Sequence, residues 1–401
     1  MTPPSILVVG GGIGGLTTAI ALLKVGLPVR VVEQAPTLGT VGAGITIQCN
    51  GSAIFDALGV TFAPEDSVSI GRFQMVSDGG RVLMQGNSDD IGLPFASLNV
   101  HRADLQATLV RHLEALGGTL ELGRKVMVLR PQDDHVDVIF EDGESTRFDL
   151  VLGVDGINST VRRCLYGSTG TRYSGQTCWR FAETVSSEVP IITMERWAKG
   201  RRAGLVPLSR SRVYGYLVLS APPGTPTPET ATVEHVVSIF GGMHDGLDEV
   251  LGQLQARVKA GEAVPIHHGD LRDQPHITFG KGRVVLLGDA GHATTPNMGQ
   301  GAGMAIEDAA AVAIALGSGG VAPERLADHL DGTRRDRVTQ VQKTSWRIGA
   351  MAHWENPVGT WFRDIGLSMM PQGTAAKQAR EMYMPGIELA DELRGIIAVR
   401  A

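Results

Sequence analysis

The fold is decided by a short stretch near the N-terminus, which reads Ile6-Leu7-Val8-Val9-Gly10-Gly11-Gly12-Ile13-Gly14-Gly15. The four apolar residues predict a buried strand, and the glycines after them predict a tight turn into a helix from Leu16 to Val25. A second strand is expected from Val29 to Val32. Strand, glycine-rich turn, helix and strand form a βαβ unit, which predicts an α/β fold that opens with a parallel sheet.

Within this unit the spacing Gly10-x-Gly12-x-x-Gly15 is followed by an acid, Glu33, at the end of the second strand. The glycines let the backbone turn tightly and approach a pyrophosphate, whose charge is met by the helix N-terminus, while Glu33 can bind ribose hydroxyls. The motif predicts dinucleotide binding rather than a purely structural turn. It does not distinguish FAD from NAD.

Two later strands also end at an aspartate. The apolar strand Leu150-Val151-Leu152 precedes Asp155-Gly156, and the strand from Arg283 to Gly288 precedes Asp289 and a glycine-rich loop into a helix from Gly303 to Leu316. This second arrangement suits a ribityl hydroxyl at Asp289 and the electron-rich edge of an isoalloxazine at the helix N-terminus. Each motif alone would be read as a strand-end turn, but their order behind the glycine motif favours FAD.

The remaining sequence predicts a second domain inserted into the first. Residues 125–140 are expected to form antiparallel strands joined at Asp133-Asp134, and the short β-like runs between about 172 and 280 a mainly antiparallel domain. From Pro323 onward the pattern is helical. We therefore predict a Rossmann-like FAD-binding domain with C-terminal helices from residues 1–70, 98–172 and 280–401, and a substrate domain from residues 71–97 and 173–279.

Composition narrows the class of protein. With 401 residues, 43% of them hydrophobic, and a net charge of −6, the chain is expected to be globular and not to bind nucleic acid, which needs a basic surface. The run from Arg334 to Arg337 is read as a solvated helix face. Three scattered cysteines and no CxxC pair argue against a disulfide framework or a zinc site, and no segment predicts a transmembrane helix or a cleavable leader. We expect a cytoplasmic protein without a metal.

At this point the sequence resembles the single-component FAD-dependent aromatic hydroxylases, also called group A flavoprotein monooxygenases. The resemblance covers nearly the whole chain and rests on Gly10 to Gly15 with Glu33, Gly42-Ala43-Gly44-Ile45, His101 to Leu105, Asp155-Gly156, and Gly288-Asp289 with Pro296 and Gly299-Gln300-Gly301. It implies a p-hydroxybenzoate hydroxylase-like fold with tightly bound, non-covalent FAD. The residues that it implies contact FAD are Gly10, Gly12, Ile13, Gly14, Gly15, Glu33, Gln34, Gly42, Ala43, Arg102, Asp155, Asp289, Pro296, Gly299, Gln300, Gly301 and Ala302.

In particular, Tyr173 to Arg180 and Gly288 to Gly303 are similar to the branch of salicylate, 3-hydroxybenzoate and urate hydroxylases. In the urate enzymes an Arg, a Tyr twelve residues later and an acid after a Thr-Thr-Pro turn act together. Arg202 and Tyr214 match the first two positions, but the third is Asn297, which cannot accept a proton as a carboxylate does. This departure argues against urate as the substrate. Arg202, Tyr214 and Asn297 are the candidate catalytic residues.

The residues themselves leave alternatives open. Arg202 could be a surface charge beside Arg201, and Tyr214 could pack in the core. Strand alternation puts Tyr216 on the same face as Tyr214, so either phenol could serve. The adjacent His267 and His268 should point to opposite sides of a strand, which disfavours a shared metal.

The resemblance implies a two-stage reaction. NADH or NADPH binds transiently and reduces FAD, and the reduced flavin reacts with O2 to a C4a-hydroperoxide that hydroxylates a small aromatic or heteroaromatic substrate. Epoxidation or oxidative rearrangement of a larger biosynthetic substrate is the second possibility, and a flavin-binding redox-responsive protein without turnover the third. A monomer or homodimer is expected.

Overall fold

The computed structural model describes residues 3–39, 43–186, 192–243 and 245–400. Its first layer is the expected parallel sheet, in which β1 pairs in parallel with both β2 and β12, and β12 with β19. In spatial order the strands are β18 (Gly280–Lys281), β19 (Val284–Leu286), β12 (Leu150–Gly153), β1 (Ile6–Val9), β2 (Val29–Val32) and β8 (Leu120–Glu121). Strands β1, β12 and β19 are buried along their whole length, as apolar strands covered on both faces must be.

The helix of the βαβ unit, α1 (Ile13–Lys24), begins three residues earlier than the sequence suggests. Gly14 and Gly15 lie inside it, because the first helical turn has to press against strand β1. Helix α9 (Gly301–Gly317), which packs against α1, likewise starts two residues before the expected Gly303.

The antiparallel segment after α4 (Arg102–Ala115) is confirmed. Strands β9 (Val126–Pro131) and β10 (Val136–Phe140) pair across the Asp133-Asp134 turn, and β11 (Ser145–Phe148) adds a third strand. A further small sheet is formed by β3 (Gly44–Ile47), β7 (Leu98–His101) and β4 (Ser67–Ser69).

The second large layer is a seven-stranded sheet that is antiparallel except between β14 and β5. In spatial order its strands are β17 (His267–Asp273), β13 (Arg172–Thr184), β16 (Arg212–Ser220), β15 (Arg201–Pro207), β14 (Ile192–Ala198), β5 (Arg72–Ser77) and β6 (Val82–Asn87). One face packs on α6 (Val233–Phe240) and α7 (Asp245–Lys259) through Trp179, Phe181 and Leu217. Apart from Arg172, this sheet lies within the region predicted to form the substrate domain. The boundaries of that domain remain a prediction.

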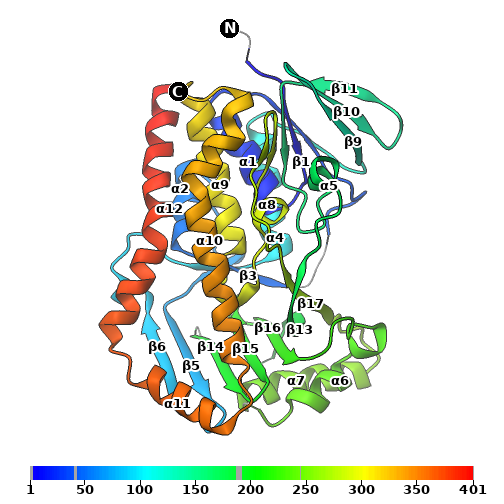
Figure 1. Ribbon diagram of the computed structural model, residues 1–401. Coiled ribbons are helices and arrows are strands. Elements are labelled where there is room, and N and C mark those ends of the chain that lie inside the picture. Colours follow the sequence, from blue (N-terminus) through cyan, green and yellow to red (C-terminus); the bar gives the residue numbers. More distant parts are fainter. Residues whose placement is uncertain (1–2, 40–42, 187–191, 244, 401) are drawn as a thin grey trace.

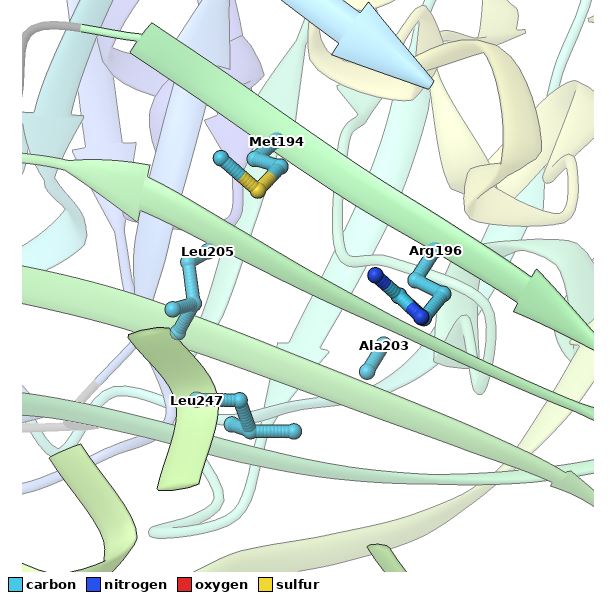
Figure 2. Close-up of a pocket in the computed structure, with 5 residues that line it drawn as sticks. All are labelled: Met194, Arg196, Ala203, Leu205 and Leu247. Carbon is cyan, nitrogen blue, oxygen red and sulfur yellow. The ribbon is translucent and has the colours of Figure 1, made fainter. Parts of the chain in front are cut away.

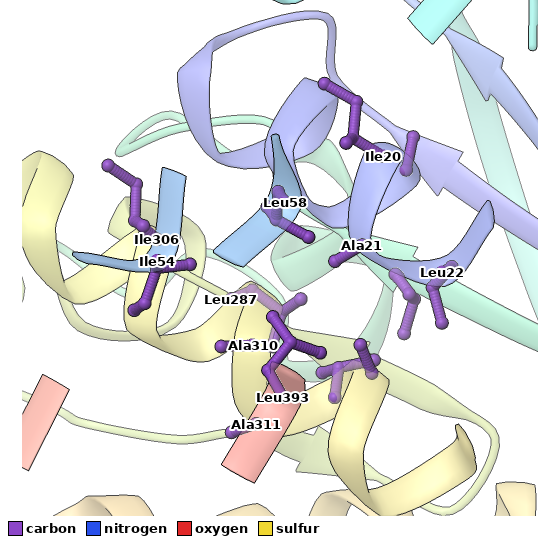
Figure 3. Close-up of a cluster of buried hydrophobic side chains, with 14 of the residues drawn as sticks. Ile20, Ala21, Leu22, Ile54, Leu58, Leu287, Ile306, Ala310, Ala311 and Leu393 are labelled. Carbon is purple, nitrogen blue, oxygen red and sulfur yellow. The ribbon is translucent and has the colours of Figure 1, made fainter. Parts of the chain in front are cut away.

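The C-terminal helices connect the two large layers. Figure 1 shows α10 (Leu326–Ala352) running from the parallel sheet down to the seven-stranded sheet, with α11 (Pro357–Ser368) at the lower end and α12 (Gln372–Arg400) returning upward. Helix α12 packs on α2 (Cys49–Leu58) and α9. Figure 3 shows this core, where Ile54 and Leu58 of α2, Ala310 of α9 and Leu393 of α12 meet, all fully buried.

The remaining short elements are α3 (Ser88–Ile91), α5 (Thr160–Tyr166), α8 (Asp289–His292), and the 3-10 turns η1 (Pro228–Thr230), η2 (Pro296–Met298) and η3 (Pro323–Arg325). Across the described residues, no helix combines the length and the apolar character that crossing a bilayer requires.

Candidate active site

The glycine turn after β1 brings three backbone segments into contact. Gly10 has φ of +119°, and a Cβ there would lie 2.5 Å from the carbonyl oxygen of Val154. A Cβ on Gly15 would lie 1.9 Å from the carbonyl oxygen of Gly10, so neither position tolerates a side chain. In contrast, no described atom lies within 4 Å of a Cβ placed on Gly12. The turn is therefore tightly packed at Gly10 and Gly15 and open at Gly12.

The N-terminus of α1 faces that open side next to Ile13. Among the described residues, no side chain caps this end and no acid occupies the first turn, so the helix presents unpaired N–H groups and a positive dipole end. An anion such as a pyrophosphate fits this position.

Glu33 lies beside the turn at the end of β2. Its Oε2 accepts a hydrogen bond from the Gly11 N–H at 2.7 Å and its Oε1 one from the Ala35 N–H at 2.9 Å. These bonds fix the carboxylate, which retains acceptor capacity for ribose hydroxyls because each oxygen has two lone pairs. Gln34 is exposed next to it.

The Asp155 carboxylate is hydrogen-bonded to residues of the loop that follows it. It accepts hydrogen bonds from Ser159 Oγ and from the Thr160 and Val161 N–H groups, and so caps helix α5. Burial raises the pKa of Asp155, although these hydrogen bonds oppose the shift. The aspartate therefore shapes the loop that touches the glycine turn, and its expected contact with a cofactor stays a prediction.

Asp289 and Arg102 approach one space from different elements. Asp289 begins α8 and Arg102 begins α4, where its N–H donates to the carbonyl oxygen of Ala43 at 2.9 Å. Both side chains are exposed, yet burial among the surrounding atoms raises the pKa of Asp289, while the nearby charge of Arg102 opposes that shift. Asp289 is therefore an accessible carboxylate with the charge of Arg102 close to it. Gly42, another predicted contact, lies outside the described residues.

The loop between β19 and α9 ends in a second open helix N-terminus. Pro296 starts the turn η2, Gly299 has φ of +61°, and Gly301 and Ala302 begin α9, which no described side chain caps. Gln300 is buried and accepts a hydrogen bond from Asn50 Nδ2 at 2.9 Å, but its Nε2 finds no partner in the described part of the chain. A polar ligand fits here.

Together these features fit a long dinucleotide such as FAD. Two uncapped helix ends, an accessible carboxylate and an unpaired buried amide are the groups that phosphate, ribityl and ring atoms would satisfy.

Behind this loop lies a buried ion network that the sequence analysis missed. Asp308 accepts hydrogen bonds from His292 Nε2 at 2.6 Å, from the Gly288 N–H at 2.9 Å and from Arg334 Nε at 3.0 Å. Although desolvation opposes it, the charges of His292 and Arg334 lower the pKa of Asp308 to about 2. The interpretation of Arg334 as solvated was wrong: it is buried, because the acids of α9 pair with it.

Arg202 is likewise buried, which excludes its interpretation as a surface charge. Its Nη2 donates to Asn297 Oδ1, and its Nη1 donates to Glu195 Oε1 at 3.1 Å. Tyr216 Oη donates to Glu195 Oε2 at 2.7 Å. The structure thus joins two of the three candidate catalytic residues and adds Glu195, for which the sequence showed no pattern.

Tyr214 stands next to this group on the same sheet face, as alternation predicted. Its ring centroid lies 5.8 Å from that of Tyr216, and it packs on Gly44, where a Cβ would come within 2.6 Å of it. Burial raises the pKa of Tyr214 to about 12, and the nearby charge of Arg180 opposes this shift. Arg180 pairs with Tyr216 on one side and with His267 on the other, so its guanidinium and the His267 imidazole belong to the same sheet face. Burial lowers the pKa of His267, and the charges of Arg180 and Arg102 add to this shift.

His267 and His268 do point to opposite sides. His268 stacks on Trp179 with ring centroids 4.0 Å apart, on the face covered by helices, and burial lowers the pKa of His268 to about 4. Within the described residues, no group of three His, Cys, Asp or Glu side chains could hold a metal ion.

Figure 2 shows a small pocket on the covered face, lined by Met194, Arg196, Ala203, Leu205 and Leu247. Its volume of about 10 Å³ is roughly the smallest space that holds one water molecule. Because Ala203 and Leu205 alternate with Arg202 and Gly204, this pocket lies on the opposite side of the sheet from the polar cluster. It is not a substrate site.

Comparison with known proteins agrees with these observations. The model of the family described as "FAD binding domain" matches residues 4–345. The chain is 34% identical to the aurachin C monooxygenase/isomerase of Stigmatella aurantiaca, over 91% of this chain and 94% of that protein. It is 29% identical to the 2-heptyl-3-hydroxy-4(1H)-quinolone synthase of Pseudomonas aeruginosa, over 96% and 99% of the two chains.

Among solved structures, Klebsiella pneumoniae HpxO in complex with FAD and uric acid superimposes with a TM-score of 0.84. It is 23% identical and covers 95% of this chain and 97% of its own. This likeness confirms the predicted fold class. The chain belongs to the FAD binding domain family, and it is a FAD-dependent monooxygenase of the aromatic hydroxylase type.

Proposed function

We propose that this enzyme uses NADH or NADPH and O2 to hydroxylate an aromatic or heteroaromatic small molecule. The observation that carries the proposal is the hydrogen bond between Arg202 and Asn297. It ties the polar face of the seven-stranded sheet to the loop that leads into α9. A ring held against this sheet face would therefore lie next to the end of the cofactor that the loop holds.

The proposed FAD site consists of the two open helix ends and the groups between them. Residues from Gly10 to Gly15 would hold the pyrophosphate, Glu33 the ribose, and Asp289 with Arg102 the ribityl chain. Gly299 to Ala302 would hold the ring edge. FAD bound by these residues would supply the redox chemistry, that is, hydride acceptance from the nicotinamide and activation of O2 for transfer of one oxygen atom.

The chain's own residues orient the substrate and keep water out. Arg202 supplies a buried positive charge that stabilises negative charge developing on the substrate. Tyr214 and Tyr216 present hydroxyl groups on the same face, and Asn297 holds Arg202 in place. A bound substrate ring would limit wasteful peroxide release because it keeps water away from the reacting atoms.

The surroundings of residue 297 favour an amide. Asn297 Nδ2 donates to the carbonyl oxygen of Ser345 at 2.8 Å and to Thr295 Oγ1 at 3.0 Å. A carboxylate in the same position would face the Ser345 carbonyl with no proton between them. This is a reason to set urate aside, and the name of the Pseudomonas aeruginosa relative, a quinolone synthase, is a reason to propose a 4-quinolone or a related fused heteroaromatic ring.

Oxidative rearrangement or epoxidation of a larger substrate is the second candidate. It is favoured by the aurachin C monooxygenase/isomerase, whose name combines oxygenation with isomerisation, and by the 32% identity over 78% of this chain to the zeaxanthin epoxidase of Solanum lycopersicum. Hydroxylation and the second candidate reaction differ in their products. Hydroxylation adds an aromatic hydroxyl group, whereas rearrangement or epoxidation gives a product without one.

The test is NAD(P)H oxidation by the FAD-loaded protein against a panel of phenols, hydroxybenzoates, purines and 4-quinolones, with peroxide assayed in parallel. A true substrate accelerates NAD(P)H oxidation, suppresses peroxide and gains one oxygen atom. If every compound left the rate and the peroxide yield unchanged, the proposed substrate class would be wrong.

A further inference from the structure

Three neighbouring strands place Glu195, Gly204 and Tyr216 in one row across the sheet. Glu195 of β14 pairs with Gly204 of β15, and Gly204 pairs with Tyr216 of β16. A Cβ on Gly204 would lie 2.0 Å from Tyr216 Cζ, so the phenol ring lies directly over the glycine. Only because residue 204 lacks a side chain does Tyr216 Oη reach Glu195 Oε2 at 2.7 Å.

Glu195 also neutralises the charge of Arg202. Its Oε1 accepts hydrogen bonds from Arg202 Nη1 at 3.1 Å and from Trp197 Nε1 at 2.8 Å. Among the residues that the structure describes, no other carboxylate forms an ion pair with Arg202, and Asn297 contributes no charge. The pair is neutral overall, so the site offers no uncompensated cation to a substrate that arrives as an anion. It suits a neutral ring with a weakly acidic O–H or N–H.

We propose that Glu195 accepts the substrate's proton through Tyr216, and so supplies the carboxylate that residue 297 does not. In this step the substrate O–H or N–H bond breaks and its proton binds Tyr216 Oη. At the same time the phenol passes its own proton to Glu195 Oε2. The products are a substrate anion, a neutral tyrosine and a protonated Glu195.

The charges favour this exchange. Before it, Arg202 faces the Glu195 carboxylate, and after it Arg202 faces the substrate anion, so one buried ion pair replaces another. Burial, helped by the charge of Glu195, raises the pKa of Tyr216 well above its usual value. Tyr216 therefore remains a phenol and conducts the proton without keeping the negative charge. The anion is the electron-rich form of the ring that takes up oxygen.

The charged and titratable groups around Glu195 come from several elements. Arg202 and Tyr216 touch it directly. His353 at the end of α10 lies near Arg202, and burial together with Arg202 lowers the pKa of His353 to about 3, so it is neutral in the range tested. Arg363 of α11 lies over the Trp197 ring at 5.3 Å. Tyr216 and His353 therefore do not change charge near neutral pH.

The inference rests on the proposed hydroxylation, and Glu195→Gln tests it. The probe is 4-hydroxyquinoline, turned over by the FAD-loaded enzyme from about pH 6 to about pH 9, well below the ordinary pKa of a buried phenol. Internal transfer makes the wild-type rate nearly independent of pH. In Glu195→Gln the proton must leave to solvent, so the rate should fall about tenfold per pH unit on acidification. If the two proteins match at about pH 9, the variant should lie roughly 1,000-fold below wild type at about pH 6.

The matched control is Glu183→Gln. Glu183 is on β13, pairs with Arg257 and lies on the sheet face covered by helices. This variant should keep the rate and the flat pH profile of the wild type. Tyr216→Phe, which leaves the Glu195–Arg202 pair in place, should reproduce the pH-dependent loss of Glu195→Gln even if the latter folds poorly.

A second readout does not depend on turnover. The ¹⁹F resonance of 6-fluoro-4-hydroxyquinoline bound to the oxidised holoenzyme reports its ionisation. It should not shift with pH in the wild type and should titrate in Glu195→Gln. Equal pH dependence of the rates and of the ¹⁹F shifts in the two proteins would overturn the role of Glu195. If the wild type binds the probe without oxidising NAD(P)H, the proposed function fails, while the ¹⁹F comparison still decides the inference.

Discussion

Arg202 donates a hydrogen bond to Asn297, and through it strand β15 of the seven-stranded sheet is fastened to the loop that opens α9. The Asn297 side chain both accepts and donates hydrogen bonds. Its Oδ1 accepts from Arg202, and its Nδ2 donates to the Ser345 carbonyl and to Thr295 Oγ1. The two halves of the site are thus joined by a side chain that must both accept and donate.

Asn297→Asp should therefore destabilise the protein. The carboxylate can still accept from Arg202 but meets the Ser345 carbonyl without a proton, which should lower the free energy of unfolding by about 1–3 kcal/mol at neutral pH. Denaturant unfolding measures it. Asn356→Asp is the control, since the Asn356 side chain accepts hydrogen bonds from the Val358 and Gly359 N–H groups at the start of α11, where an acid is favoured. Equal stability of both variants and wild type would contradict this reading of residue 297.

Gly204→Ala should remove the contact between Tyr216 and Glu195. The added methyl group occupies the space of the phenol ring, so we expect a loss of about 1–3 kcal/mol of unfolding free energy and the same activity defect as Tyr216→Phe. Gly269→Ala in the same sheet is the control, because the nearest atom to its Cβ is 4.0 Å away. A Gly204→Ala variant with wild-type activity would show that Tyr216 does not need its place above residue 204.

Asp289→Ala should weaken FAD binding. Loss of the charged acceptor at the start of α8 is expected to raise the Kd for FAD about 10- to 100-fold, measured by the flavin absorbance of protein reconstituted with known FAD concentrations. Asp328→Ala, on the exposed surface of α10, should bind FAD like the wild type. Unchanged affinity in Asp289→Ala would remove this residue from the proposed cofactor site.

Asp308 should make the fold sensitive to acid. Its pKa is lowered from 3.8 in the unfolded chain to about 2 in the folded one, so its contribution is complete above about pH 4 and is lost as the pH falls towards 2, an effect of about 2 kcal/mol. The difference in unfolding free energy between wild type and Asp308→Asn should shrink over that window. Asp328→Asn should leave the acid limb of the wild-type curve unchanged. A difference that stays constant with pH would contradict the ion network.

The sequence predicted most of the fold because the deciding signals are local. The glycines of the β1–α1 turn and the apolar strands β12 and β19 each specify backbone geometry within a few residues. The start of α1 was placed too late, since glycines at 14 and 15 look like loop residues until the helix is seen pressing on Gly10.

The candidate site was less predictable because its contacts depend on strand register. Glu195 lies in a strand with no motif, and its meaning comes from Gly204 and Tyr216 on two neighbouring strands. Arg334 was misread for the same reason: its partners Glu307 and Asp308 are 27 and 26 residues away, on another helix. A local charge pattern cannot show a pairing that only tertiary packing creates.

The most direct test of the account is to supply ¹⁸O2 to the FAD-loaded enzyme with NAD(P)H and the best substrate of the panel. We expect one ¹⁸O atom in each product molecule and one NAD(P)H oxidised per hydroxylation. Product without the isotope, or NAD(P)H oxidation that yields only hydrogen peroxide with every compound, would contradict it.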